Sequence, residues 1–171
     1  MLTFKDLRLA QHDIIDRQYE GDAVQVVLGM GGGKTAATLT TIFELRRDGI
    51  RRKAIVLAPP MVATSVWPRE CAKWVHLQDT KVVDVSGTPQ QRLKLLMGEG
   101  DVFAVSIYNA KWLADVLATL PDNHPLLDIL VIDELSKLKG PRSKLGRALV
   151  EQSHRIKTIW GLTGTPRPNG F

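Results

Sequence analysis

A glycine-rich segment is the first place where this chain could do chemistry. Consecutive glycines let backbone N–H groups approach a ligand without side chains in the way, and such donors at a helix start bind phosphate oxygens. Lys34 would reach the β- and γ-phosphates of ATP, and the Thr35 hydroxyl would bind Mg²⁺. The predicted nucleotide-binding residues are Gly29, Met30, Gly31, Gly32, Gly33, Lys34 and Thr35.

The general phosphate-loop pattern has a glycine where this chain has Leu28. A tight surface turn with an incidental lysine is therefore the alternative interpretation. The context favours the phosphate loop, because an apolar run, Val24–Leu28, leads into the glycines and a helical pattern follows them.

A pair of adjacent carboxylates, Asp133 and Glu134, is the second candidate for chemistry. The pair ends an apolar run that reads as a buried strand, and ligands of open parallel sheets bind at the carboxyl ends of strands. Two such acids raise each other's pKa unless a cation is near. We expect Asp133 to hold the metal and Glu134 to orient or deprotonate the attacking water. Carboxylates that cap the following turn are the alternative.

A hydroxyl-rich turn, Thr163-Gly164-Thr165-Pro166, is the third candidate. It follows a predicted strand, so it would reach the same edge of the sheet as the acidic pair. There it could hydrogen-bond the two carboxylates and sense the γ-phosphate, although the tetrapeptide is also ordinary turn chemistry.

The elements that must position these residues alternate between short apolar runs and segments of helical period. Near-continuous apolar strands are typical of a parallel sheet that is covered on both faces. The predicted strands are Val24–Leu28, Ala54–Ala58, Lys81–Val85, Val102–Ser106, Ile129–Asp133 and Thr158–Leu162. The predicted helices are Lys34–Arg47, Val66–Val75 with Ser65 as its cap, Pro89–Met97, Ala110–Leu117 and Arg142–Glu151. This alternation predicts one α/β domain over residues 1–171, a three-layer sandwich with a mostly parallel sheet.

Net charge, cysteine content and the length of apolar runs limit the class of protein. The net charge of +5 is compatible with a polyanionic partner but does not require one. Two basic clusters could serve such a partner or could be solvated faces: Arg46, Arg47, Arg51, Arg52 and Lys53, and Lys137, Lys139, Arg142, Lys144 and Arg147. The single cysteine, Cys71, predicts a reducing, cytoplasmic setting, and no apolar run approaches the length of a membrane span.

In this order the three segments resemble the first RecA-like lobe of superfamily 2 helicases and translocases. The closest branch is that of the Snf-type DNA translocases, including phage-encoded relatives, for which the compartment would be the host cytoplasm. In that branch the loop reads Met-Gly-x-Gly-Lys-Thr, as Met30–Thr35 does, and the first glycine of the general pattern is commonly missing. Asp133–Lys137 and Leu162–Pro166 are similar to its acidic-box and Leu-Thr-Gly-Thr-Pro segments.

Softer similarities extend over most of the chain. The resemblance implies that Gln11 reads adenine, although Leu9-Ala10 stands where the family has Pro-Tyr. It also implies contact with nucleic acid, or coupling to it, for Pro59, Ser106, Tyr108, Asn109, Thr163 and Thr165. Trp67 and Trp74, which lie in the segment that lines the nucleic-acid path in the family, favour core positions by their helical spacing.

The resemblance implies the ATP-binding lobe of a DNA-stimulated ATPase motor, with ATP, Mg²⁺ and DNA as ligands. The engine of the family closes two lobes on ATP, and this chain has room for the first lobe only, so its abrupt end at Phe171 reads as a cut. Two alternatives remain: a small P-loop kinase, which would need an arginine-rich lid, and a single-lobe protein that binds nucleic acid without catalysis.

Overall fold

The computed structural model describes residues 1–29, 31, 33–134 and 144–164, and all structural statements refer to these residues. Six strands form one sheet in the order β1-β6-β5-β2-β4-β3, and every pairing between neighbours is parallel. The strands are β1 (Ala23–Val27), β2 (Ala54–Ala58), β3 (Val82–Val85), β4 (Val102–Ser106), β5 (Ile129–Asp133) and β6 (Thr158–Thr163). The predicted parallel sheet is thus confirmed.

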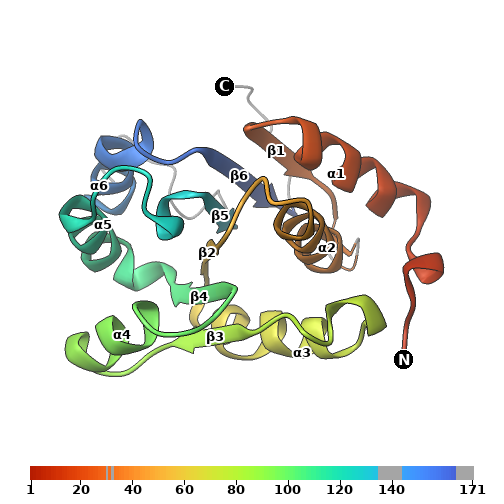
Figure 1. Cartoon of the computed structure of the whole chain (residues 1–171), viewed down its shortest axis with the longest axis horizontal. Coiled ribbons are helices and arrows are strands. Elements are labelled where there is room, and N and C mark those ends of the chain that lie inside the picture. The colour runs from red at the N-terminus through yellow and green to blue at the C-terminus, as the bar shows by residue number, and fades with distance from the viewer. Residues whose placement is uncertain (30, 32, 135–143, 165–171) are drawn as a thin grey trace.

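Helices cover both faces of this sheet. In Figure 1, α1, α2 and α3 lie on one side of it and α4, α5 and α6 on the other. Their bounds are α1 (Leu9–Glu20), α2 (Lys34–Arg47), α3 (Trp67–Ala72), α4 (Pro89–Leu96), α5 (Ala110–Thr119) and α6 (Lys144–Ser153). The predicted three-layer α/β sandwich is confirmed.

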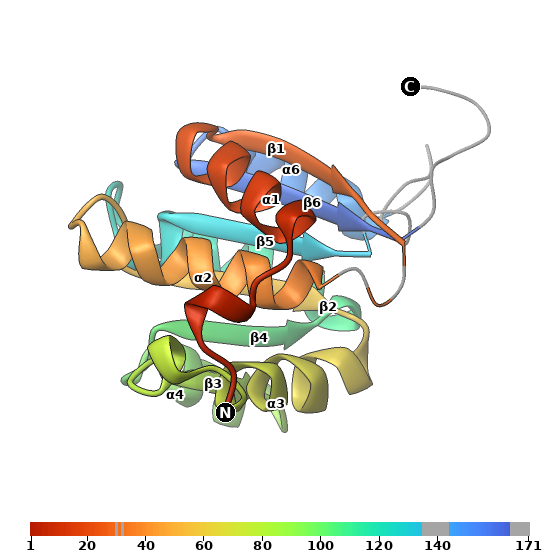
Figure 2. The same cartoon turned by 90° about the vertical axis from the view of Figure 1, so that its right-hand side faces the viewer.

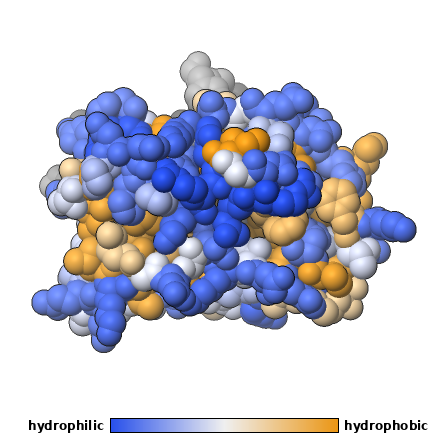
Figure 3. Space-filling model, viewed as in Figure 1, coloured by the Kyte–Doolittle hydropathy of each residue, from blue (hydrophilic) through white to orange (hydrophobic). Residues whose placement is uncertain are grey.

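Alternate residues along each central strand pack into two separate hydrophobic cores, one on each face of the sheet. Ala54, Val56 and Ala58 of β2 pack in the core beneath α1, α2 and α3. Ile55 and Leu57 of the same strand pack in the core beneath α4, α5 and α6. Because both faces are covered, the strand is apolar at every position, which explains why it reads as a continuous apolar run. On the outside, Figure 3 shows a largely hydrophilic face on which apolar residues form separate patches.

The first helix, α1, was not among the predicted elements. Its buried residues are Gln11, Ile14, Ile15 and Gln18, a spacing typical of one helix face. Two of the four are glutamines, so a search for apolar periodicity misses the helix. Gln18 is satisfied in the core by α2, because its amide nitrogen donates to Thr38 and its amide oxygen accepts from Thr41, each at 3.1 Å.

The predicted helix Val66–Val75 with Ser65 as its cap is wrong in its start. The chain is already helical at Val62 and forms a π-helical turn, Val62–Val66, before α3 begins at Trp67. Ser65 lies inside that turn, and no side chain caps α3. Pro68 does fall in the first turn of α3, as predicted.

The first basic cluster lies at the amino ends of the strands, where acidic side chains pair with it. Arg52 donates to Asp128 from its backbone N at 2.6 Å and from Nε at 3.0 Å. Asp128 is only 1% exposed. Burial opposes its ionisation, but the hydrogen bonds and charge of Arg52 hold the pKa of Asp128 below its ordinary value. Further ion pairs join Arg46 to Asp101, Arg47 to Asp48 and Arg51 to Asp22. These four arginines are therefore engaged in ion pairs within the fold.

Cys71 is buried in α3, and burial raises the pKa of its thiol to about 11. A thiol of that pKa is not a nucleophile near neutral pH. Among the described residues, no helix has both the length and the apolar character needed to cross a membrane.

We predict that Asp128→Asn lowers the free energy of unfolding by about 2 kcal/mol, because it removes the charge that Arg52 and Lys157 face in a buried site. Since the folded pKa is depressed, this stabilisation is present above the ordinary pKa of 3.8 and is lost as the pH falls below it. Urea unfolding at pH 7 and at a pH well below 3.8 measures both effects.

The matched control is Asp122→Asn, because Asp122 pairs with Arg155 but its side chain is 90% exposed. We expect this variant to unfold as the wild type does. Equal losses for the two variants would contradict the assignment of Asp128 as the stabilising partner.

Candidate nucleotide-binding site

The glycine-rich segment connects the edge strand β1 to the start of α2, as predicted. Gly31 has φ +75° and Gly33, which immediately precedes α2, has φ +81°. Both values lie in the left-handed region that side chains other than glycine rarely adopt, so the turn depends on glycine at these two positions. Met30 and Gly32 lie outside the described residues.

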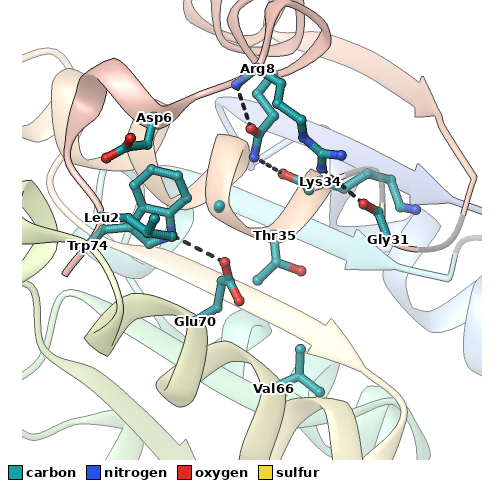
Figure 4. Close-up of a pocket in the computed structure, with 12 residues that line it drawn as sticks. Leu2, Asp6, Arg8, Gly31, Lys34, Thr35, Val66, Glu70 and Trp74 are labelled. Carbon is teal, nitrogen blue, oxygen red and sulfur yellow. Dashed lines mark hydrogen bonds between the residues drawn. The ribbon is translucent and has the colours of Figure 1, made fainter.

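The start of α1 holds this segment in place. The amide oxygen of Gln11 accepts from the backbone N–H of Arg8 at 2.8 Å, and its amide nitrogen donates to the carbonyl of Gly33 at 3.1 Å. The guanidinium of Arg8 donates to the carbonyl of Gly31 at 2.9 Å. Figure 4 shows these bonds converging on the loop. Gln11 therefore lies beside the loop with both ends of its amide in use, and its reading of adenine stays a prediction.

A pocket of about 440 Å³ opens beside the loop. Figure 4 shows its walls: the loop and the start of α2 on one side, and the N-terminal segment and α3 on the other. Lys34 and Thr35 lie on the loop side, and Glu70 and Trp74 lie on the α3 side. This volume is in the range of small-molecule sites. The ammonium of Lys34 donates to the carbonyl of Leu28 at 2.6 Å, which places it within the loop.

The acidic pair lies at the same edge of the sheet. Asp133 ends β5 and is 9% exposed. Burial raises the pKa of Asp133 above its ordinary value and the charge of Glu134 adds to this, whereas a hydrogen bond from Trp67 and the charge of Lys34 lower it. The charge of Lys34 thus acts on the carboxylate of Asp133, and a nucleotide shared by the two side chains stays a prediction.

Glu134 begins the turn after β5 in a strained backbone conformation, with φ +64°. Such a value costs on the order of 1 kcal/mol in a residue that carries a side chain. Its carboxylate oxygen Oε1 accepts a hydrogen bond from the backbone N–H of Gly164 at 3.2 Å. One contact between the third motif and the acidic pair is thus made by a backbone N–H, and the predicted contacts of the threonine hydroxyls stay a prediction.

The order of the strands explains this contact. β6 lies between β1 and β5, so its carboxyl end lies between the glycine-rich loop and the acidic pair. Figure 2 shows β1, β5 and β4 pointing toward the same side of the molecule, where β1 leads into the loop. Thr163 ends β6 and is buried. Thr165 lies outside the described residues.

The residues predicted to contact nucleic acid are brought to the same edge on neighbouring strands. Ala58 of β2, which immediately precedes Pro59, pairs with Ser106 of β4. Ser106 accepts from the N–H of Tyr108 at 3.3 Å and so caps the short 3₁₀ turn that contains Asn109. Tyr108 is 75% exposed. Contact of these four residues with nucleic acid stays a prediction.

Trp67 and Trp74 are both buried, which confirms the prediction that they are core residues. Trp67 nevertheless reaches the site: its indole N–H donates to Oδ2 of Asp133 at 2.9 Å. The sequence marks Trp67 as an apolar position on a helix, and no spacing rule connects it to an acid on a different strand.

The residues present fit a nucleotide-bound magnesium ion. The candidate protein donors are the hydroxyl of Thr35, in the first turn of α2, and the carboxylate of Asp133. Within residues 1–29, 31, 33–134 and 144–164, no group of three or more His, Cys, Asp or Glu side chains could hold a metal by itself. Oxygen atoms of phosphate and water would therefore complete the coordination, as is usual for Mg²⁺.

Comparison with known sequences identifies the family. A profile of the SNF2-related domain matches residues 27–171. A protein designated p41 from Acyrthosiphon pisum secondary endosymbiont phage 1 is 39% identical over 178 aligned residues, which cover 100% of this chain and 38% of that protein. The DNA repair and recombination protein RDH54 of Saccharomyces cerevisiae is 28% identical over 162 residues, covering 82% of this chain and 17% of that protein. The chain thus spans less than two-fifths of the length of these relatives.

Solved structures share the fold. The SWI2/SNF2 ATPase core of Sulfolobus solfataricus, solved in complex with double-stranded DNA, superposes with a TM-score of 0.76 at 20% identity. The match covers 94% of this chain and 32% of that one. The UvsW helicase of bacteriophage T4 superposes with a TM-score of 0.69 at 12% identity. These likenesses confirm the RecA-like lobe as the fold.

We predict that Gly33→Ala weakens ATP binding about tenfold, a loss of roughly 1.4 kcal/mol. A β-carbon at this position would lie 2.3 Å from the amide nitrogen of Gln11, so the glutamine must move and release the loop. Isothermal titration calorimetry with Mg-ATP measures the affinity.

Gly49→Ala is the matched control. Gly49 also has a left-handed φ, +72°, but a β-carbon there would meet nothing within 4 Å. We expect both variants to lose stability through backbone strain and only Gly33→Ala to lose affinity. Equal ATP affinities in the two variants would show that Gln11 does not hold the loop in its binding geometry.

Proposed function

The chain belongs to the SNF2-related domain family, and on that premise we propose that it is the ATP-binding lobe of a DNA-stimulated motor ATPase. The observation that supports the proposal is the strand order, which brings the loop after β1 and the acidic pair after β5 to one edge of the sheet with β6 alone between the two strands. An ammonium, a glycine cradle and paired acids at one place are the parts that a Mg-ATP hydrolase needs.

Each part has a separate task. Backbone N–H groups of the loop and the ammonium of Lys34 hold the β- and γ-phosphates. Thr35 and Asp133 would hold a magnesium ion, which when bound would supply positive charge beside the phosphate oxygens. Glu134 orients the attacking water and accepts its proton. The bond from Gly164 to Glu134 supports this task, because it fixes one carboxylate oxygen and the other would face the water.

The whole protein would contain more than this lobe. The chain covers 38% of the phage relative and 32% of the Sulfolobus ATPase core, so a second RecA-like lobe fits within the remaining length of such proteins. That lobe would supply an arginine that stabilises the transferring phosphate. DNA would bind across the carboxyl edge near Pro59, Ser106, Tyr108 and Asn109, in the cytoplasm of the cell or of a phage host.

Membership of this family favours the motor over the nucleotide kinase that the sequence left open. A single-lobe protein that binds nucleic acid without catalysis differs from the motor in a measurable way, because it would release no phosphate from ATP.

We predict that Lys34→Ala lowers ATP affinity at least about tenfold, because it removes the charge that pairs with the phosphates. Glu134→Gln, which keeps the hydrogen-bonding shape but cannot accept a proton, is expected to bind ATP normally and to lose about 10²–10⁴-fold in turnover. Equilibrium dialysis with labelled ATP and single-turnover phosphate release measure the two quantities.

Lys53→Ala is the matched lysine control, because Lys53 packs over the ring of Phe103 near the amino end of β2. It should leave both quantities unchanged. Full turnover in Glu134→Gln would assign the proton acceptor elsewhere, and normal ATP binding in Lys34→Ala would contradict the phosphate loop.

We also predict that the 171-residue chain by itself hydrolyses ATP feebly. An arginine supplied by a second lobe is worth about 10³–10⁵ in rate for related phosphoryl transfers, and this chain would lack it. Steady-state phosphate release with and without duplex DNA tests this. Vigorous, DNA-stimulated turnover by the purified chain would contradict the division of labour between two lobes.

A further inference from the structure

The indole of Trp67 is bonded to the one carboxylate that the proposed function assigns to the metal. Trp67 is 0% exposed and donates from Nε1 to Oδ2 of Asp133 at 2.9 Å. An indole has one donor and no acceptor, so a buried tryptophan needs a partner for its N–H. Trp160, the other fully buried tryptophan of the described residues, donates to the backbone carbonyl of Gly21 at 3.0 Å. A carbonyl would thus satisfy an indole, and the choice of an acidic partner calls for an explanation.

The local backbone is arranged so that this indole faces β5. Trp67 comes directly after the π-helical turn Val62–Val66, and its own N–H bonds to the carbonyl of Val62, five residues earlier. A π-turn inserts about one extra residue into the helix, which rotates the residues after it by about 100° around the axis. The turn therefore sets which face of α3 carries the indole toward the sheet. Such turns frequently occur at functional sites.

We propose that Trp67 is a positioning residue for Mg²⁺: its indole N–H fixes one carboxylate oxygen of Asp133 and leaves the other to the cation. This inference rests on the proposed function, which makes Asp133 the metal-binding residue. Trp67 touches neither the nucleotide nor the metal, and it acts through the orientation of the carboxylate.

The physical reason is the strict geometry of magnesium. Mg²⁺ requires near-octahedral oxygen ligands at fixed distances, so a carboxylate that turns about its bond binds it less well. Hydrogen bonds to the ligands of a metal typically contribute about 10–100-fold to metal affinity. The indole does not titrate, so it holds Asp133 without adding a charge to the site.

The helix that carries Trp67 also connects Asp133 to the carboxyl end of β2. The π-turn comes after Pro59 and Pro60, at the carboxyl end of β2, and the N–H of Ala63 bonds to the carbonyl of Pro59 at 2.9 Å. A continuous stretch of helix therefore joins the end of β2 to the carboxylate of β5 through Trp67.

The test is Trp67→Phe, which keeps an aromatic ring in the core and removes the donor. ATP binding is measured by equilibrium dialysis over a series of Mg²⁺ concentrations and in EDTA. We expect the Mg²⁺ concentration at half-saturation to rise about tenfold. ATP binding in EDTA should equal that of the wild type, because the loop is untouched. A purely structural role for Trp67 would instead weaken ATP binding with and without metal.

Trp160→Phe is the matched control, because it removes an equally buried indole whose partner is a backbone carbonyl at the other end of the core. It should lose similar stability and keep the Mg²⁺ requirement of the wild type. The inference is overturned if Trp67→Phe and Trp160→Phe have the same Mg²⁺ requirement.

A measurement on the wild type covers the case in which Trp67→Phe does not fold. The chain has four tryptophans and so four indole N–H signals in a ¹⁵N-correlated NMR spectrum. Phe substitutions at Trp74, Trp112 and Trp160 identify the Trp67 signal by elimination. Adding Mg²⁺ to the ATP-bound protein should shift this signal and leave that of Trp160 in place. A stationary Trp67 signal would overturn the inference.

The outcomes separate this inference from the proposed function. If the wild type shows no Mg²⁺-dependent ATP binding, the proposed function fails and the role of Trp67 fails with it. If the wild type binds Mg-ATP and Trp67→Phe behaves as Trp160→Phe does, the proposed function stands and only the role of Trp67 is rejected.

Discussion

The residues Lys34, Asp133 and Glu134 lie at or beyond the carboxyl ends of their strands at one edge of the sheet, because those strands are parallel. β1 leads into the Lys34 loop, β5 ends on Asp133, and β6 alone lies between them. Asp133 is buried, and burial raises the pKa of its carboxyl, so a nearby positive charge favours its ionised form. The ammonium of Lys34 provides such a charge. The site therefore depends first on the order and direction of the strands, and only then on its individual side chains.

Charged side chains have different surroundings at the amino and carboxyl ends of the strands. At the amino ends, arginines and aspartates pair within the protein, as Arg52 and Asp128 do. The carboxylate of Asp128 is buried, so its pairing with Arg52 stabilises the fold. At the carboxyl ends, Glu134 is held in a strained backbone conformation and Lys34 bonds to a carbonyl of its own loop. Strain of this kind persists where the surrounding structure fixes it, and it is common at functional sites.

Much of the architecture could be predicted because the central strands are covered on both faces. Ala54–Ala58, Val102–Ser106 and Ile129–Asp133 were predicted with the bounds that the structure has, since a fully buried strand is apolar throughout. The first helix could not be found in that way, because Gln11 and Gln18 occupy positions of its buried face. Their amides are satisfied by α2 and by the loop, and partners of this kind are invisible in the sequence.

The sequence by itself determined the family, the sheet and the two motifs, because glycines before a lysine and acids after an apolar run each have a local physical reason. The tertiary structure alone decided what surrounds them. It placed Gln11 against Gly33, the N–H of Gly164 on Glu134, and the indole of Trp67 on Asp133. These bonds join residues that lie from 22 to 66 positions apart. Their geometry follows from strand order and helix phase, which no short stretch of sequence specifies.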